Sequence, residues 1–592
     1  MEETTKVTKK ASEASEKSAL PQKPKSSQPF YMILLETAWA HPIFTALFLC
    51  VFAMTLTTGK HVTKIGMIMP SLAVFLMGVC AGLHIVRNDI KHKSNAVLVS
   101  FILFAASFAG LFAVMVYQAD RPGAAVLNFG LAAITGVYIY LGVKNKLTTK
   151  NIVLLIAAAG FLIRLAYIMY LSITLHQHDV SSIGTGKGHI GYIEFLCQHN
   201  YLPPDDVRNT DQFYHAPLHH IIASMWVKVQ YTYGISYESA FENVQLLTLF
   251  YSSVCFILSY KIFRKLKLNG KGLIFASAVI AFSPTFIILS ASINNDILSV
   301  TLMLGAIYNT LRWYEKQTFK NIIPIALCVG FGMMTKLSVW MITPAIAFVF
   351  LFVFFGNLKN YKKNLAQFGI FGIICIPLGL YWPLRNLIRD GVPITYVPKL
   401  SETSKQYVGN IPMMQRLFDF DLHQFKDVGD QFTMYGGEYN EYNPLVALFK
   451  TASFDEGITT KNYPAIAGFN TILFWSMVLI GLAGFIAMVY MLIKNKTELN
   501  RCTKIFLALL YAVIFVSYYV FCFEFPHVCT ENIRYAVPLI VIGAYFIGLA
   551  IQRLLAAHNR IKTAAARVLC TAVIVYAASS TIVYDIVSHK VW

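Results

Sequence analysis

The chain has 592 residues, of which 56% are hydrophobic and only 13% are charged, and its mean hydropathy is +0.56. This composition excludes a soluble domain of such size and indicates a membrane protein. The formal net charge of +19 could suggest a nucleic-acid partner, but Lys and Arg stand in short clusters between apolar segments. We therefore expect no nucleic acid and interpret the clusters as a positive-inside signal.

Apolar runs recur along the chain and are separated by polar linkers. Each run has about 17–25 residues, enough for a helix to cross about 30 Å of hydrocarbon. The sequence predicts an all-α polytopic membrane protein with about 13–15 transmembrane helices and long extracytoplasmic loops. The predicted spans are 41–58, 66–86, 95–117, 124–143, 151–175, 240–262, 273–291, 297–313, 321–335, 337–355, 367–384, 466–493, 504–523, 534–552 and 568–587.

Composition also divides the chain into regions. Residues 1–30 are rich in Lys, Glu, Ser and Thr and lack an apolar run, so we expect a disordered cytoplasmic tail. Residues 31–150 are interpreted as an N-terminal transmembrane extension, because no intramembrane charge or long loop marks them. Residues 151–555 are predicted to form the core, and 556–592 a C-terminal transmembrane helix and tail.

Basic linkers alternate with long polar loops. With the tail inside, the linkers all fall on the cytoplasmic side; they are 87–93, 144–150, 261–271, 312–320, 359–363, 494–504 and 553–567. The loops 176–239, 385–465 and 524–533 then lie on the opposite face. Outer loops of the length of the first two are usually functional.

Histidines gather in the first outer loop. His215 and His219 are four positions apart on a predicted helix, as metal ligands can be, but no complete ligand spacing is present, so we predict no metal. The alternative is that these histidines lie at the membrane interface and hydrogen-bond lipid headgroups. The seven in this interval are His176, His178, His189, His199, His215, His219 and His220.

Polar segments are expected to converge on the outer membrane surface. Asp179 directly follows a predicted span, and five other segments end or begin spans on the same face. Carboxylates and cations near one interface suit an anionic lipid headgroup and a reacting hydroxyl. The five segments are Tyr214–His220, Asn294–Asp296, Thr335–Ser338, Tyr381–Asn386 and Glu531–Tyr535.

Over residues 150–550, this order of motifs resembles the GT-C class of membrane glycosyltransferases, in particular the protein O-mannosyltransferases and lipid A aminoarabinose transferases. The resemblance implies a sugar carried on a polyprenyl phosphate and its transfer to an acceptor on the non-cytoplasmic face. Protein mannosyltransferases carry an Asp-Glu pair in the first loop, where this chain has His178-Asp179, so a glycan, a lipid and a protein all stay open as acceptors. The anchors of the resemblance are Asp179, the Tyr-His-x-Pro-Leu segment 214–218, Lys336, Arg385-Asn386 and Arg534-Tyr535.

The chemistry of such a transfer suggests roles for these residues. Asp179 is assigned as the general base, because a hydroxyl attacking an anomeric carbon must lose its proton. A departing lipid phosphate needs fixed positive charge, which we assign to Lys336, Arg385 and Arg534. One base without a general acid predicts inversion, and no cofactor is predicted. Possible substrate-binding residues are His178, Tyr214, His215, Asp296 and Tyr535.

Each assignment has a structural alternative. Asp179 could be a solvated helix cap, Asp296 an N-cap, and Lys336 a snorkelling cation. Glu194 is expected on an interfacial helix, where a carboxylate is usually solvated.

Two other functions compete with a glycosyltransferase. A transporter or flippase for a lipid-linked or anionic substrate should show internal repeats, intramembrane charges or broken helices at the bilayer midplane, and the sequence shows none in evident form. A non-catalytic scaffold would give Asp179 and the clustered cations no purpose.

We expect a multi-pass protein of a bacterial plasma membrane, with its active site on the extracytoplasmic face. Its partners would be the lipid-linked donor, membrane lipid and the acceptor.

Overall fold

The computed structural model describes residues 36, 38–58, 121–173, 175, 177–420, 442–453, 462–494, 497–557 and 559–589. The chain divides into two compact units, Met1–Pro42 and Ile43–Trp592. The second unit holds the helical core and the candidate site.

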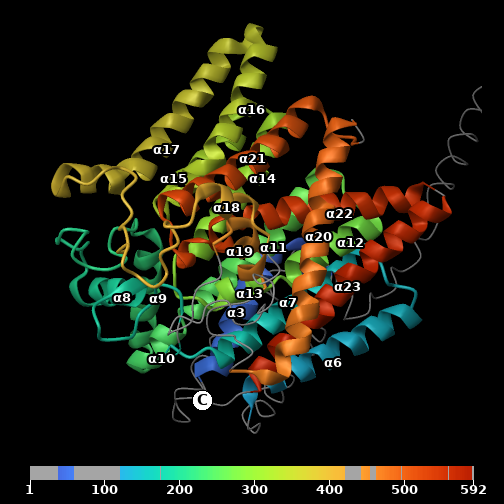
Figure 1. Cartoon of the computed structure of the whole chain (residues 1–592), viewed down its shortest axis with the longest axis horizontal. Helices are drawn as coiled ribbons and strands as arrows, with labels where there is room; N and C mark the ends of the chain where they lie inside the picture. Colours follow the sequence, from blue (N-terminus) through green and yellow to red (C-terminus); the bar gives the residue numbers. More distant parts are fainter. Residues whose placement is uncertain are drawn as a thin grey trace, which may run out of the picture. The chain divides into compact units, whose positions relative to one another are not determined.

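Most helices coincide with the predicted spans (Figure 1). They are α3 (Pro42–Thr58), α6 (Pro122–Val143), α7 (Thr149–Tyr170), α11 (Gln245–Lys265), α12 (Gly270–Ala281), α13 (Pro284–Ala291), α14 (Asp296–Glu315), α15 (Phe319–Met333), α16 (Thr343–Gly356), α17 (Tyr361–Asp390), α20 (Ala467–Ile493), α21 (Arg501–Glu524), α22 (Pro538–Ala556) and α23 (Arg560–Ser588). The helices in the outer loops are α8 (Gly188–His199), α9 (Leu218–Thr232), α10 (Tyr237–Glu242), α18 (Met413–Phe418) and α19 (Pro444–Thr451). Short 3₁₀ turns are η1 (Leu337–Ile342), η2 (Leu358–Asn360), η4 (Pro464–Ile466), η5 (Val528–Thr530) and η6 (Ile533–Tyr535).

The all-α polytopic class is confirmed. Within the described residues, nine helices are long and apolar enough to cross a membrane, and the bent pair α12–α13 makes ten. Helices α3, α14 and α15 also coincide with predicted spans but fall outside that count. The predicted spans 66–86 and 95–117, like the predicted tail 1–30, lie outside the described residues.

Several helices begin at local sequence signals. The side chains of Thr148, Asn500 and Asn559 each accept a hydrogen bond from a backbone N–H in the first turn of α7, α21 and α23, as N-cap residues do. Proline occupies the first helical position of α6 and α22, where its missing N–H costs nothing. The starts of α6, α7, α21 and α22 lie within four residues of the predicted boundaries, whereas α23 starts eight residues before its predicted boundary.

Helix α17 runs further than the sequence predicts. The outer loop was expected to begin at residue 385, but α17 continues to Asp390, through Pro377 and Pro383, and ends at Gly391 with φ of +66°. A left-handed glycine of this kind is a common helix stop, whereas the two prolines bend the helix without ending it. Arg385 therefore lies inside a helix.

One span is broken, contrary to the expectation from the sequence. Helices α12 and α13 are bent by 43° at Ser283-Pro284, and the buried Arg164 of α7 binds the broken end. Its guanidinium donates to the carbonyls of Ala281 and Ile280 at 2.7 and 3.1 Å, to Gly160 O at 2.7 Å and to the Ser252 hydroxyl at 3.0 Å. An intramembrane charge and a broken helix are thus present, but the bonds of Arg164 are to the protein itself, so the pair stabilises the fold and does not favour a transporter.

Close helix packing holds the core together. Helix α12 packs on α22 and on α7, while α14 packs on α15 and α11. The approach of α12 to α22 requires glycine at both positions of contact, because a Cβ on Gly272 would lie 2.4 Å from the carbonyl oxygen of Gly548. Small residues allow backbones to approach in this way in membrane proteins.

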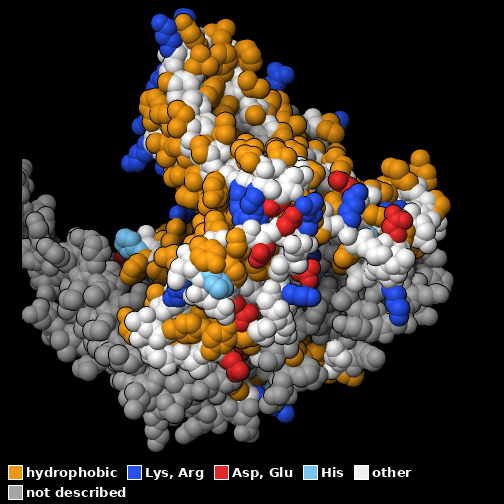
Figure 2. All heavy atoms as spheres, turned by 90° about the vertical axis from the view of Figure 1, so that its left-hand side faces the viewer, with side chains coloured by type: hydrophobic (Ala, Val, Ile, Leu, Met, Phe, Trp, Pro, Cys, Tyr) orange, Lys and Arg blue, Asp and Glu red, His pale blue; other side chains and the backbone are white. Residues whose placement is uncertain are grey.

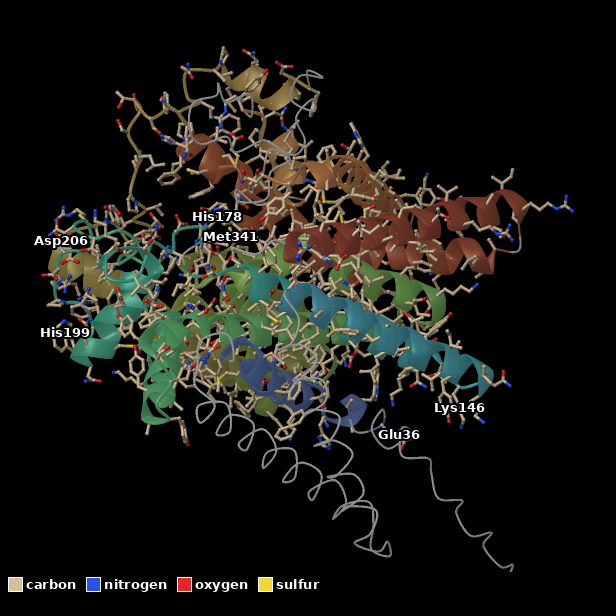
Figure 3. All side chains as sticks on the ribbon, turned by 90° about the horizontal axis from the view of Figure 1, so that it is seen from below. Glu36, Lys146, His178, His199, Asp206 and Met341 are labelled. Carbon is tan, nitrogen blue, oxygen red and sulfur yellow. The ribbon has the colours of Figure 1, made fainter. Side chains whose placement is uncertain are left out.

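The first outer loop lies at the opposite end of the helices from a basic linker. Figure 3 shows Lys146, between α6 and α7, at one end of the view and Asp206 and His199 at the other. Figure 2 shows hydrophobic side chains over the upper part of the face, where Figure 1 places α16 and α17, with Lys and Arg at its top. This distribution agrees with membrane helices that carry basic linkers on one side and charged outer loops on the other.

Candidate active site

Asp179 lies in a tight turn between α7 and α8. It adopts a left-handed backbone conformation, with φ of +61°, which aspartate tolerates better than most residues. Two backbone bonds from the start of α8 hold the turn: His189 N donates to Asp179 O at 3.0 Å, and Ile190 N donates to Val180 O at 3.2 Å. The folding of α8 therefore sets the position of the carboxylate.

Hydrogen bonds between loops bring the predicted polar segments together. Ile293 N donates to the Gln177 side chain at 3.0 Å, which ties the Asp179 turn to the start of α14. The Asn295 side chain donates to Thr335 O at 2.9 Å, which ties α14 to the break between α15 and η1. At that break, Leu218 N donates to Met334 O at 3.0 Å, so the start of α9 joins as well.

These bonds assemble a cluster of two carboxylates and two cations, which we call the charged cluster: Asp179, Asp296, Lys336 and Arg534. Arg534 Nη1 lies 2.7 Å from Asp179 Oδ2 and 3.8 Å from Asp296 Oδ2. Lys336 Nζ donates to Asp296 Oδ1. Asp296 is 3% exposed and Arg534 8%, but Asp179 is 37% exposed, so the candidate base is the member of the pair that substrate can reach.

Tyr535 lies beneath both cations. Lys336 Nζ and Arg534 Cζ are each 4.9 Å from the centre of its ring, and Arg534 Nη2 donates to its hydroxyl at 2.9 Å. Cations over an aromatic face are attracted by the ring. The Tyr535 ring therefore contacts both cations of the charged cluster.

Tyr214, His215 and His178 stand beside the charged cluster. Burial, with a contribution from the Asp179 charge, raises the pKa of Tyr214 well above its usual value. Burial and the Lys336 charge lower the pKa of His215 to about 3. Both are therefore neutral at physiological pH and can serve as hydrogen-bonding groups. His178 is buried next to Asp179 in the same turn.

Burial and ion pairing act in opposite directions on Asp179. Burial alone would raise the pKa of its carboxyl, but the Arg534 guanidinium outweighs this and holds the pKa well below its usual value. Asp179 is therefore a carboxylate at neutral pH. As long as it is paired with Arg534 it is also a weak base, because a proton bound there would displace the cation.

Arg385 is separate from the charged cluster. Its guanidinium donates to Pro203 O and, at 3.0 Å, to the Asn386 side chain, and it lies over the Trp382 ring at 4.2 Å. Trp382 in turn donates to Tyr214 O at 3.0 Å. The described contacts of Arg385 attach the first outer loop to α17.

One expectation and one alternative interpretation for the first outer loop are wrong. Glu194 is buried, not solvated; its carboxylate accepts the Gly184 N–H at 2.9 Å and the Tyr237 hydroxyl at 2.5 Å. His189, His219 and His220 are also buried and do not lie at a lipid interface. The reason is that α8 and α9 pack on each other and enclose the side chains between them.

One buried ion pair was missed by sequence reasoning. Arg416 of α18 binds Glu531 at 2.6 Å, with both side chains almost fully buried, and it also donates to Cys522 O at 2.9 Å. The pair joins the second outer loop to the segment that carries Arg534. The two residues are 115 positions apart, and no spacing rule in a sequence reports such a contact.

No resident cation is suggested by the described side chains. In the part of the chain that the structure describes, no three His, Cys, Asp or Glu side chains are grouped as metal ligands. His176, one of the seven histidines of the first outer loop, lies outside that part. Fixed positive charge in the site comes from Lys336 and Arg534.

Comparisons with known proteins bear on the same region. Residues 226–382 match the family model of dolichyl-phosphate-mannose-protein mannosyltransferases. This segment runs from α9 into α17 and contains Asp296 and Lys336, while Asp179 and Arg534 lie outside it. No curated protein sequence matched the chain.

Solved structures with some similarity include an oligosaccharyltransferase from Archaeoglobus fulgidus. Its apo form is 14% identical, with a TM-score of 0.44, over 74% of this chain and 56% of that chain. The same archaeal enzyme, AglB, in complex with an inhibitory peptide and a dolichol-phosphate, is 14% identical with a TM-score of 0.43 over the same shares. The chain thus spans a little over half the length of these structures.

The segment that matches the family model overlaps the candidate active site. The matched segment lies within a polytopic helical fold and supplies two members of the charged cluster. The GT-C resemblance noted in the order of the sequence motifs therefore agrees with an independent comparison. Residues 226–382 are thus similar to the dolichyl-phosphate-mannose-protein mannosyltransferases, and they lie within a multi-pass membrane protein.

Proposed function

We propose that this protein transfers a sugar from a polyprenyl phosphate to an acceptor hydroxyl, with Asp179 as the general base. The observation that carries the proposal is the charged cluster itself. An accessible carboxylate stands 2.7 Å from a guanidinium, and a second cation lies over the same aromatic ring. This places a proton acceptor beside positive charge that can hold a departing phosphate.

The reaction balances without a further reactant. The acceptor oxygen forms a bond to the anomeric carbon as its proton passes to the Asp179 carboxylate. The bond between the anomeric carbon and the phosphate oxygen breaks, and its electron pair stays on the lipid phosphate, next to Arg534 and Lys336. Attack opposite the leaving phosphate gives inversion at the anomeric carbon.

The donor class follows from the family whose model matches residues 226–382. That family is named for a mannose carried on dolichyl phosphate and for protein acceptors. We infer a polyprenyl-phosphate sugar as the donor here. The neutral Tyr214 and His215 beside Asp179 are suited to bind hydroxyl groups of the sugar or the acceptor, and the acceptor itself is a glycan, a lipid or a protein.

The active site is proposed to face the extracytoplasmic side of a bacterial plasma membrane. The basic linker 144–150 and the first outer loop lie at opposite ends of α7, and basic linkers are retained in the cytoplasm. In this proposal the lipid-linked donor approaches Arg534 from the bilayer, and the acceptor approaches the exposed Asp179 from water.

Asp179→Asn tests the proposal. The amide keeps the size of the side chain but takes no proton at neutral pH, so transfer from polyprenyl-phosphate sugars should fall by at least about a hundredfold. His178→Ala should cost less, because His178 would at most orient the carboxylate. Release of lipid phosphate by purified protein, over a panel of such donors, measures both effects.

Asp206→Asn is the matched control for this experiment. Asp206 is also a carboxylate of the first outer loop paired with an arginine, 2.5 Å from Arg208, but it belongs to a surface pair away from the charged cluster. Its variant should transfer at the wild-type rate. Asp179→Asn protein that is folded and still transfers at more than a tenth of the wild-type rate would overturn the proposed function.

A further inference from the structure

We propose that the donor phosphate takes Arg534 away from Asp179, so that the carboxylate is released as a base only when the donor is bound. The inference rests on the proposed function, because it concerns how the same site is activated by its own substrate. It follows from the unequal way in which the two carboxylates of the charged cluster are held.

The charged cluster is neutral as a whole, with two carboxylates facing two cations. A phosphate therefore gains little from it unless a carboxylate gives up its partner. Asp296 is not suited to do so, since it is 3% exposed and a buried charge that loses its partner is costly. Asp179 is 37% exposed, so water can solvate its carboxylate once Arg534 has turned to the phosphate.

Arg534 is anchored independently of Asp179. Its guanidinium lies over the Tyr535 ring and donates to the Tyr535 hydroxyl, and its backbone N–H donates to the Asn532 side chain at 3.0 Å. Its buried Nε–H has no acceptor among the described residues. Arg534 thus keeps its contacts with Tyr535 and Asn532 when its guanidinium turns from Asp179 to a phosphate, and it has a donor left for a phosphate oxygen.

The exchange resolves a conflict in the chemistry. A carboxylate paired with arginine is a poor proton acceptor, because the cation holds its pKa well below the usual value. The general base of a transfer reaction needs the opposite. When the phosphate replaces Asp179 on Arg534, the same event that supplies the electrophile raises the basicity of the base.

The other groups around Asp179 do not cancel this gain. His178 and His189 are the further charged or titratable neighbours that favour its ionised form, and Tyr214 faces it from the adjoining loop. Burial holds the pKa of His189 well below 6.5, and Tyr214 keeps its proton. Among the groups that interact with Asp179, Arg534 is the one that is positively charged at any physiological pH. Arg534 therefore holds the pKa of Asp179 low.

Binding of a sugar-free ligand tests the exchange. A short-chain polyprenyl monophosphate is titrated into the purified full chain in detergent, and its Kd is measured by calorimetry for wild type, Asp179→Asn and Asp206→Asn. Removing the competing carboxylate should tighten binding by about tenfold, which corresponds to about 1.4 kcal/mol. Asp206→Asn should bind as the wild type does. Unchanged or weaker binding by folded Asp179→Asn overturns the exchange.

A kinetic measurement on the wild type covers the case in which the variant does not fold. The pH profile of kcat/KM for the donor reports Asp179 in the free enzyme, and that of kcat/KM for the acceptor at saturating donor reports it in the donor complex. The acid limb should lie at higher pH in the second profile. Coinciding limbs contradict the exchange.

The two proposals fail separately. If Asp179→Asn binds the phosphate tenfold more tightly and transfers no sugar, both stand. If it transfers no sugar but binds no more tightly, Asp179 is the base and the exchange is wrong. If it still transfers sugar, the proposed function is wrong whatever the affinity.

Discussion

Three histidines of the first outer loop, His189, His215 and His220, stack on one another, and the ring of His219 meets that of His220 edge-on. The ring of His189 lies 5.4 Å from that of His215 and 5.1 Å from that of His220, and His189 Nδ1 is 2.9 Å from His220 Nε2. Burial lowers the pKa of His219 to about 4 and holds those of His189 and His220 well below the usual 6.5. These rings are therefore neutral at physiological pH.

The buried rings make folding sensitive to acid. In the unfolded chain each takes up a proton near 6.5, whereas in the folded protein it does so only at much lower pH. Their contribution to stability is thus complete above 6.5 and is lost as the pH falls below it, by about 1.4 kcal/mol per pH unit for each ring. Thermal denaturation in detergent between pH 7.5 and 5 measures this slope. His220→Phe should flatten it, while the exposed His199→Ala should not; equal slopes in all three proteins would refute the account.

At the scale of elements, the broken span α12–α13 depends on a single side chain. Arg164→Met would leave the carbonyls of Ala281 and Ile280 without the donor that they have in the structure. Each unsatisfied buried carbonyl costs about 1–3 kcal/mol, so we expect unfolding at clearly lower temperature. Lys265→Met, which breaks an ion pair with the exposed Glu315, should have little effect. An Arg164→Met protein as stable as the wild type would show that the broken span does not need the hydrogen bonds of Arg164.

At the scale of the whole molecule, the prediction concerns which loops face outward. Glu402, in the second outer loop, and Lys362, at the start of α17, are both exposed and should lie on opposite sides of the membrane. In a background without Cys197 and Cys529, a membrane-impermeant maleimide applied to intact cells should label Glu402→Cys. Lys362→Cys should react only after permeabilisation. If only Lys362→Cys were labelled in intact cells, the topology would be the reverse of the predicted one. If both variants were labelled, the predicted topology would be wrong.

The sequence by itself determined the class of the protein and the position of most of the helices that the structure describes. Hydropathy is a local property, and a run of apolar residues must form a helix in hydrocarbon wherever it stands. The same reasoning placed Asp179, Asp296, Lys336 and Arg534 at helix ends on one face. It predicted that they converge, although not which of them pair.

Only the tertiary structure decided the partners. Asp179 and Arg534 are 355 positions apart, and nothing in the sequence shows that the assigned base and the assigned phosphate ligand bind each other. Arg385 is also an arginine on the same predicted face as Arg534, yet it lies inside α17 and binds Pro203 O, the Asn386 side chain and the Trp382 ring. Ion pairs, the burial of the histidines and the break at Ser283 depend on how distant segments pack, and packing is set by the whole set of side chains at once.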